Sequence, residues 1–246
     1  MNSSNANFNA GPQLLTAFDR FDPRLAPVLG IDEHLASVPH DRLTPAGLRQ
    51  RFQFPQLWEP EHNVEKKFSN RVPVKAAVLI PLVMRSQLMV LLTQRSDTLS
   101  THSGQIAFPG GRVDATDIDA ADTAMREASE EVGLSRINVE VLGTLPAYVT
   151  GTGYIITPVV ALIHPSVILV GNPGEVADIF EVPLPYLMNP ANHRRHEIEL
   201  GGIRRQWLSM PYVHQPNEVD GSRGKERFIW GATAGMLRNL YRFLAV

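Results

Sequence analysis

The chain contains no cysteine among its 246 residues, which excludes disulfide bonds, zinc–thiolate centres and catalytic thiols. Its net charge of only −2 argues against broad electrostatic attraction to nucleic acid or to a membrane surface. Long apolar runs are also missing: the longest, 76–83 and 155–163, are far shorter than the roughly 20 residues of a bilayer-spanning helix. The polar N-terminus lacks the basic and apolar regions of a signal peptide. These absences predict a soluble cytoplasmic protein that uses neither nucleic acid nor a membrane as partner.

The composition that remains is that of an ordinary globular protein, with 43% hydrophobic residues. We interpret residues 1–70 as an N-terminal extension and connecting segment whose first twelve or so residues are disordered. Residues 71–246 are then the main domain. The extension contains one clear helix start, where Thr44 is placed as the N-cap and Pro45 as the first helical residue.

The main domain is predicted to combine many strands with few helices. Apolar runs predict strands at residues 74–83, 88–94, 105–108, 139–145, 154–163, 195–200 and 204–210. The last two alternate around Gly201-Gly202, which predicts a hairpin. Pro158 assigns its strand to a sheet edge or to a bulge, because proline cannot donate to the ladder. Residues 175–188 are predicted as a short helical segment with a Pro-broken turn, and 230–244 as an amphipathic C-terminal helix.

The most informative segment runs from Gly104 to Leu134 and ends in a helix rich in glutamate. Apolar residues at helical spacing predict this helix, with Asp119 as its N-cap and Gly133 just past its end. At about 100° per residue, the side chains of Glu127, Glu130 and Glu131 fall within an arc of roughly 100°.

Three carboxylates on one flank of a helix repel one another. A cation relieves that repulsion, and hard carboxylate oxygens suit Mg²⁺ or Mn²⁺, which keep further coordination positions for water and substrate phosphate. The alternative for Glu130 is an ordinary surface ion pair with Arg126, four residues earlier on the helix. The pattern predicts a divalent metal site at Glu127, Glu130 and Glu131.

The segment resembles the Nudix box, in which a glycine loop and an acidic residue precede Arg-Glu-x-x-Glu-Glu-x-Gly. There are two departures: the early acidic position holds Asp117 instead of glutamate, and one extra residue separates it from Arg126. Asp119 therefore competes with Asp117 for the role of orienting Arg126.

The preceding residues 91–111, LLTQRSDTLSTHSGQIAFPGG, resemble the signature of the coenzyme A pyrophosphatase branch of Nudix hydrolases. That branch also carries the one-residue lengthening of the box. The resemblance implies an α/β/α sandwich with a mixed sheet. It also implies metal-dependent hydrolysis of the pyrophosphate bond of coenzyme A or its thioesters, giving adenosine 3′,5′-bisphosphate and 4′-phosphopantetheine or its acyl form.

Site roles follow from the same resemblance. Glu127, Glu130 and Glu131 are the expected ligands of Mg²⁺ or Mn²⁺, Arg126 is a catalytic residue, and either Glu130 or Glu175 is the general base. Residues expected to bind substrate are Arg95, His102, Gln105, Gly110, Gly111 and Arg112. Each has a structural alternative: Glu175 as an acidic residue at a helix start, Arg95 as a strand cap, His102 as a loop hydrogen-bond donor, and the glycines as a simple turn.

Two other functions fit the motifs. The first is a Nudix enzyme for another nucleoside diphosphate compound, such as ADP-ribose, a dinucleotide or a nucleoside triphosphate. The second is a non-catalytic nucleotide-binding Nudix domain.

Three roles are open for the N-terminal extension, residues 1–70. It could be a homodimer contact, a lid over the acyl end of the substrate, or a cover for the core.

Overall fold

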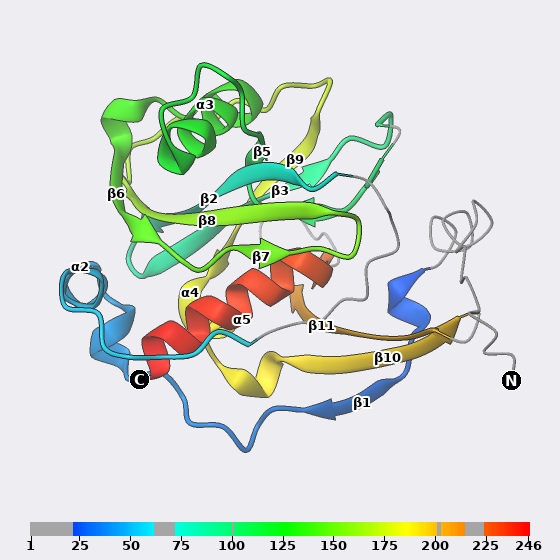
Figure 1. Cartoon of the computed structure of the whole chain (residues 1–246). Helices are drawn as coiled ribbons and strands as arrows, with labels where there is room; N and C mark the ends of the chain where they lie inside the picture. The colour runs from blue at the N-terminus through cyan, green and yellow to red at the C-terminus, as the bar shows by residue number, and fades with distance from the viewer. Residues whose placement is uncertain (1–21, 62–71, 100, 201–202, 215–223) are drawn as a thin grey trace, which may run out of the picture.

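The C-terminal helix α5 (Gly231–Ala245) lies between two β-sheets in the computed structural model, and helix α3 (Ala120–Val132) covers the far face of the larger sheet (Figure 1). The structure describes residues 22–61, 72–99, 101–200, 203–214 and 224–246. The predicted N-terminal disorder and the Gly201-Gly202 turn lie outside these ranges. Among the described residues, no helix combines the length and apolar character needed to cross a membrane.

The larger sheet is mixed, as predicted. It comprises β2 (Val74–Met84), β3 (Leu88–Arg95), β4 (Ile106–Ala107), β5 (Gly110–Arg112), β6 (Val139–Thr144), β7 (Tyr148–Val149), β8 (Tyr154–Ile163) and β9 (Val176–Pro183). Strands β2 and β8 pair in parallel, and the other pairs are antiparallel. The first half of β2 pairs with β5 and its last residues pair with β3, so the glycine loop is held directly against a central strand.

The smaller sheet is antiparallel and takes its edge strand from the extension. Its order is β1 (Val28–Ile31), β10 (Arg194–Leu200), β11 (Ile203–Val213) and β12 (Glu226–Trp230). The hairpin of β10 and β11 confirms the predicted pairing. The remaining helices are α2 (Pro45–Gln53) and α4 (Leu184–Leu187), with 3-10 turns η1 (Pro23–Leu25), η2 (His40–Leu43), η3 (Arg136–Asn138) and η4 (Pro190–Asn192).

The helix starts and stops follow the local chemistry expected of them. The Thr44 hydroxyl accepts from the backbone N–H of Gly47 at 3.1 Å, so α2 begins where predicted. Asp119 caps α3 by accepting from the N–H of Asp122, and Gly133 ends it with a φ of 68°. Only glycine adopts that left-handed conformation without a steric penalty, which fixes the end of the glutamate helix.

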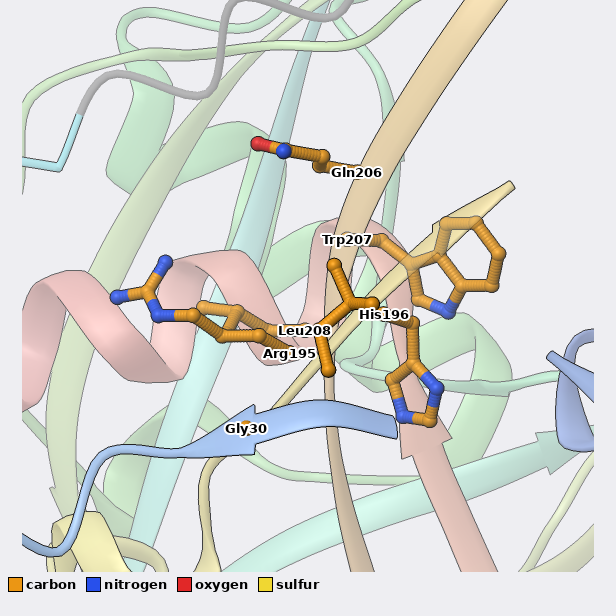
Figure 2. Close-up of a pocket in the computed structure, with 7 residues that line it drawn as sticks. Gly30, Arg195, His196, Gln206, Trp207 and Leu208 are labelled. Atoms are coloured by element: carbon orange, nitrogen blue, oxygen red, sulfur yellow. The ribbon is translucent and has the colours of Figure 1, made fainter. Parts of the chain in front are cut away.

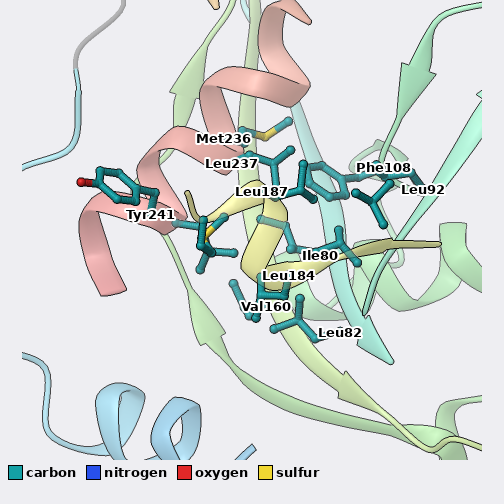
Figure 3. Packing of buried hydrophobic residues seen from close by; sticks show 14 of the residues in the cluster. Ile80, Leu82, Leu92, Phe108, Val160, Leu184, Leu187, Met236, Leu237 and Tyr241 are labelled. Atoms are coloured by element: carbon teal, nitrogen blue, oxygen red, sulfur yellow. The ribbon is translucent and has the colours of Figure 1, made fainter. Parts of the chain in front are cut away.

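Two apolar clusters hold the layers together. One lies between α3 and the larger sheet, where Ala124, Ala128 and Val132 are fully buried. The other surrounds α5 and joins both sheets (Figure 3). In it, Leu237 of α5 packs among residues such as Leu92 of the larger sheet. The glutamate helix therefore rests on a rigid sheet that is supported from its other face.

Of the two alternatives predicted for Pro158, the edge strand is wrong. Its strand, β8, lies between β2 on one side and β6 and β7 on the other. The register shift in this part of the ladder is in β6, between Val141 and Gly143, opposite Ala161 and Val160 of β8. Proline is accommodated because β6 pairs with residues from Val159 onward and β7 with residues up to Ile156. Pro158 falls in the gap between these two partners, where no ladder bond requires its missing N–H.

The prediction of a helical segment at 175–188 is also largely wrong. Residues Val176–Pro183 form β9, which pairs along all of β3, and only Leu184–Leu187 are helical. The register of β9 shifts opposite Gln94 and Arg95. This bulge breaks the apolar alternation by which strands are recognised in sequence, and the open edge of β3 supplies the hydrogen bonds that select a strand.

Candidate active site

Arg126, in the middle of α3, is the centre of an ion-pair cluster. Its Nε and one terminal nitrogen donate to the two carboxylate oxygens of Asp117, at 2.9 and 3.0 Å. The other terminal nitrogen donates to Glu127 at 2.9 Å and to Glu130 at 3.2 Å. The backbone carbonyl of Arg112 also accepts from Arg126 at 3.1 Å. Arg126 thus links the glycine loop, the Asp-rich turn and the glutamate helix.

Asp117, and not Asp119, orients Arg126. Besides both arginine bonds, the Asp117 carboxylate accepts from the Thr123 hydroxyl and from the N–H of Asp114, each at 2.8 Å. Hydrogen bonds from Arg126 hold the pKa of Asp117 well below its usual range, while Asp117 raises the pKa of Arg126. Asp119 instead caps the helix, so the two acidic residues have separate functions.

The three box glutamates occupy very different environments. The Glu131 residue is 4% exposed, the Glu127 side chain is 16% exposed and the Glu130 side chain is 57% exposed. Glu130 therefore stands at the solvent edge, where its ion pair with Arg126 matches the structural alternative stated for it. Glu127 and Glu131, which lie nearer the sheet, are the inner pair.

Burial dominates the electrostatics of the inner pair. It raises the pKa of Glu131 to about 8, and the negative charges of Glu127 and Glu175 act in the same direction. Arg95 and a hydrogen bond from the backbone of Gly110 oppose this rise. Burial also raises the pKa of Glu127, against the opposing effect of Arg126. Closely placed carboxylates in a partly dry site store repulsion that a cation would relieve.

Glu175 comes from a different part of the chain but is held beside this pair. Its carbonyl accepts from the N–H of Ser96 at 2.8 Å, and its own N–H donates to the carbonyl of Asn172 at 3.0 Å. The N–H of Asn172 in turn donates to the carbonyl of Glu131 at 2.8 Å. The helix-start alternative for Glu175 is wrong, because a strand and not a helix follows it.

Gly110 and Gly111 permit close approach and do not adopt positive φ. A Cβ atom on Gly110 would lie 2.5 Å from the carbonyl oxygen of Ala77 and 2.6 Å from the Cα of Val78. A Cβ on Gly111 would lie 2.5 Å from the carboxyl carbon of Glu127. The first glycine therefore seats the loop on β2, and the second leaves room for a box glutamate.

The other expected substrate residues form two groups. His102, with a φ of 57°, donates through Nδ1 to the Gln105 side chain at 3.1 Å, and the N–H of Arg95 donates to the Gln105 carbonyl at 2.9 Å. Arg112 directly follows the two glycines in β5 and pairs with Ala76 of β2. Its guanidinium donates to the Tyr154 hydroxyl at 3.1 Å. Arg95 is the member of this set whose charge acts on Glu131.

Sequence reasoning missed several residues that build the site. Thr123, Asn172 and Tyr154 have no place in the motif, and each acts through a contact described above with Asp117, Glu131 or Arg112. The pocket shown in Figure 2 lies elsewhere, on the smaller sheet between β1, β10 and β11, where Arg195, His196 and Trp207 contribute to its lining. It contains none of the expected site residues.

The donor chemistry of the inner pair fits a hard divalent cation, because buried carboxylate oxygens lie next to one another without enough positive charge. Within the described ranges, however, no three Asp, Glu or His side chains already converge as a metal cage. Glu127 and Glu130 are turned toward Arg126 instead. The residues thus fit the ion by composition and burial, and Arg126 engages only one carboxylate oxygen of Glu127, which leaves the other for an ion.

Comparison with known proteins agrees with this geometry. The model of the NUDIX domain family matches residues 73–219. The chain is 42% identical over 188 residues to a protein of Escherichia fergusonii named "Uncharacterized Nudix hydrolase NudL", covering 75% of this chain and 88% of that protein. The protein of the same name from Escherichia coli K12 matches with the same identity and coverage.

This chain belongs to the Nudix hydrolase family and is a pyrophosphatase of that family. Nudix enzymes typically use divalent metal ions and bind small molecules derived from nucleotides. A solved Ap4A hydrolase of Caenorhabditis elegans is similar at 22% identity with a TM-score of 0.39, covering 48% of this chain and 85% of that one.

Proposed function

We propose that this enzyme hydrolyses the pyrophosphate bond of coenzyme A or its thioesters, with Mg²⁺ or Mn²⁺ held by Glu127 and Glu131. The observation that carries the chemistry is the grouping of Glu127, Glu131 and Glu175 from two separate elements beside Arg95. The choice of coenzyme A is supported by the residues 91–111 that resemble that branch.

A bound divalent ion would neutralise charge on the diphosphate and lower the pKa of a water molecule. The protein supplies the rest. Glu127 and Glu131 would hold the ion, and Glu130, at the solvent edge, would complete the ligand set or act through water. Asp117 holds the Arg126 guanidinium in place, so that Arg126 orients Glu127 and Glu130. Positioning of this kind supplies much of the rate in phosphoryl transfer.

Glu175 is the better of the two candidates for the general base. Its negative charge acts on both Glu127 and Glu131, and its backbone is anchored by bonds to Asn172 and Ser96. Glu130 is largely exposed and is engaged by Arg126. A base must lie within reach of the attacking water. Both side chains are exposed, so what separates them is that Arg126 engages the Glu130 carboxylate while the Glu175 backbone is fixed.

Arginine side chains complete the proposed substrate site. Arg95, beside Gln105, and Arg112, at the end of β5, can each donate to phosphate oxygens, as a guanidinium fork does. His102 and Gln105, already hydrogen-bonded to each other, would contact the portion of coenzyme A beyond the diphosphate. Because Gly110 and Gly111 carry no side chain, the loop backbone packs closely on β2 and leaves space for substrate to approach the glutamates.

We assign the extension, residues 1–70, a covering role on the hydrolase domain, residues 71–246. Its described part supplies β1 to the smaller sheet and places α2 against the end of α5. Both contacts lie within one chain, which favours a core cover over a lid or a homodimer contact.

The test is identification of products by mass spectrometry with purified enzyme and Mg²⁺. Coenzyme A, acetyl-coenzyme A, ADP-ribose, a dinucleotide and a nucleoside triphosphate would be incubated in parallel, with Glu131→Gln as the matched variant. We expect adenosine 3′,5′-bisphosphate from both coenzyme A compounds, and loss of at least 100-fold in kcat for the variant. Cleavage of another substrate alone would refute the coenzyme A assignment, and nucleotide binding without turnover would indicate a binding domain.

A further inference from the structure

Arg227 of β12 joins the two sheets close to the candidate site, although no motif includes it. Its guanidinium donates to the Asp178 carboxylate at 2.7 Å and to the Gln94 side chain at 3.1 Å. It also lies 4.1 Å from the centre of the Phe180 ring. The residue is only 8% exposed. One buried cation of the smaller sheet therefore holds neighbouring strands β3 and β9 of the larger sheet.

The contacts of Arg227 fall at the bulge in β9. Gln94 pairs with Asp178, but the next residue, Arg95, pairs with Val176, so Ala177 is the extra residue. Because of this extra residue, the first side chains of β9 point to the face of the sheet opposite to the one that regular alternation would give them. Val176 and Ile179, three residues apart, both pack in the cluster beneath α3. Regular alternation would have placed them on opposite faces.

The position of Glu175 depends on that reversal. Immediately before the bulge, the carbonyl of Glu175 is bound by the N–H of Ser96, the residue after Arg95. Removing the extra residue from the register would shift Glu175 by one position along β3. It would then lose both this bond and its place next to the turn that Asn172 ties to Glu131.

We propose that Arg227 is a positioning residue, which holds the β9 bulge through Asp178 and Gln94 and so presents Glu175 to Glu127 and Glu131. This inference rests on the proposed function, in which Glu175 is the general base. Arg227 itself need not touch substrate, because its contacts act on the strand that carries Glu175. Misplacing a catalytic group by about 1 Å can cost a large factor in rate while leaving substrate binding intact.

The matched control is Arg85, which makes an ion pair with the same strand away from the bulge. Its guanidinium donates to Glu181 of β9 at 2.7 Å, and it also donates to the carbonyl of Pro165. Glu181 pairs with Leu91, in a regular part of the ladder. Arg85→Gln therefore removes an arginine contact to β9 without removing the support of the bulge.

The experiment measures kcat and KM for Arg227→Gln, Arg227→Lys and Arg85→Gln, and repeats Arg227→Gln in a Glu175→Gln background. We expect Arg227→Gln to lower kcat at least 10-fold with KM within about twofold, Arg227→Lys to recover part of that loss, and Arg85→Gln to stay within twofold of wild type. In the Glu175→Gln background, Arg227→Gln should cause almost no further loss. Urea unfolding of each variant shows that the folded protein is being assayed.

An equal effect of Arg227→Gln and Arg85→Gln, or a full 10-fold loss in the Glu175→Gln background, would overturn the positioning role. A near wild-type rate for Glu175→Gln alone would instead refute Glu175 as base, so the two failures are distinguishable. If Arg227→Gln does not fold, Asp178→Asn weakens the same support from β9, and the same comparison with Glu175→Gln applies.

Discussion

At the scale of single residues, the site depends on a few positions where size or charge leaves no alternative. Asp117 accepts four hydrogen bonds, two of them from Arg126. The motif left this role open between Asp117 and Asp119, since both precede the helix. Their side-chain directions separate them, and these depend on how the loop folds back over α3.

Asp117→Asn should lower kcat/KM at least 10-fold, because the loss of its charge frees Arg126 to bind Glu127 and Glu130 more tightly. The control is Asp119→Ala, which should cost only about 1 kcal/mol of unfolding free energy, the usual value of a lost N-cap. Activity assays at saturating Mg²⁺ and urea unfolding test both. A greater loss of activity in Asp119→Ala than in Asp117→Asn would reverse the assignment.

We expect an added methyl group to lower stability at Gly110 and to lower activity at Gly111. In Gly110→Ala the methyl group meets backbone atoms of β2, which cannot move aside, so we expect a loss of roughly 1–3 kcal/mol in unfolding free energy. In Gly111→Ala it meets the end of the Glu127 side chain, which can rotate away. Stability should then be nearly unchanged while kcat falls. Equal destabilisation of the two variants, measured in urea, would contradict this distinction.

At the scale of elements, the helices with local signals and the strands with clear apolar runs were predicted well, whereas two features that depend on strand pairing were not. Helices α2 and α3 carry their own N-caps, and α5 is marked by its apolar spacing. Strand β9 forms because β3 offers an open edge, and the β9 bulge hides its alternation from the sequence. Pro158 is tolerated in the interior strand β8 because the neighbouring strand is interrupted there. Neither feature is local to the residues concerned.

Helix α2 offers a paired test of buried and exposed arginines. Arg51 is 6% exposed and donates to the carbonyl of Phe243 near the end of α5 at 2.7 Å, whereas Arg49 forms an exposed ion pair with Glu140. Arg51→Met should cost about 1.5–3 kcal/mol, the usual range for a hydrogen bond to a charged group. Arg49→Met should cost less than about 1 kcal/mol. Urea unfolding at pH 7 measures both, and a larger loss for Arg49→Met would refute the ranking.

At the scale of the whole molecule, the extension and the C-terminal helix are joined by a buried polar network. Arg238 of α5, 2% exposed, contacts Asp32 and Glu61 of the extension and donates to Nδ1 of His193 at 3.0 Å. The other ring nitrogen of His193 donates to the carbonyl of Leu187 at 2.7 Å. Since Arg238 only donates, His193 is neutral in this network.

This network predicts a loss of stability in acid. Burial, together with the charge of Arg238, lowers the pKa of His193 to about 4 from its usual 6.5. The unfolded chain therefore takes up this proton first as pH falls, and stability is lost between pH 6.5 and 4. Wild type should lose about 2–3 kcal/mol more than His193→Gln between pH 7.5 and 4.5 in urea unfolding. Parallel losses in the two proteins would exclude His193 as the cause.

The sequence alone determined the family and the glutamate helix with its two ends, and it supplied the carboxylates that we propose as metal ligands. These are properties of residues close together in the chain, where helical spacing and capping chemistry act within a few turns. The tertiary structure decided that Asp117 orients Arg126, that Glu131 is buried while Glu130 is exposed, and that Glu175 joins them through β9. Those outcomes depend on burial and on strand pairing between distant segments, which act only once the chain has folded.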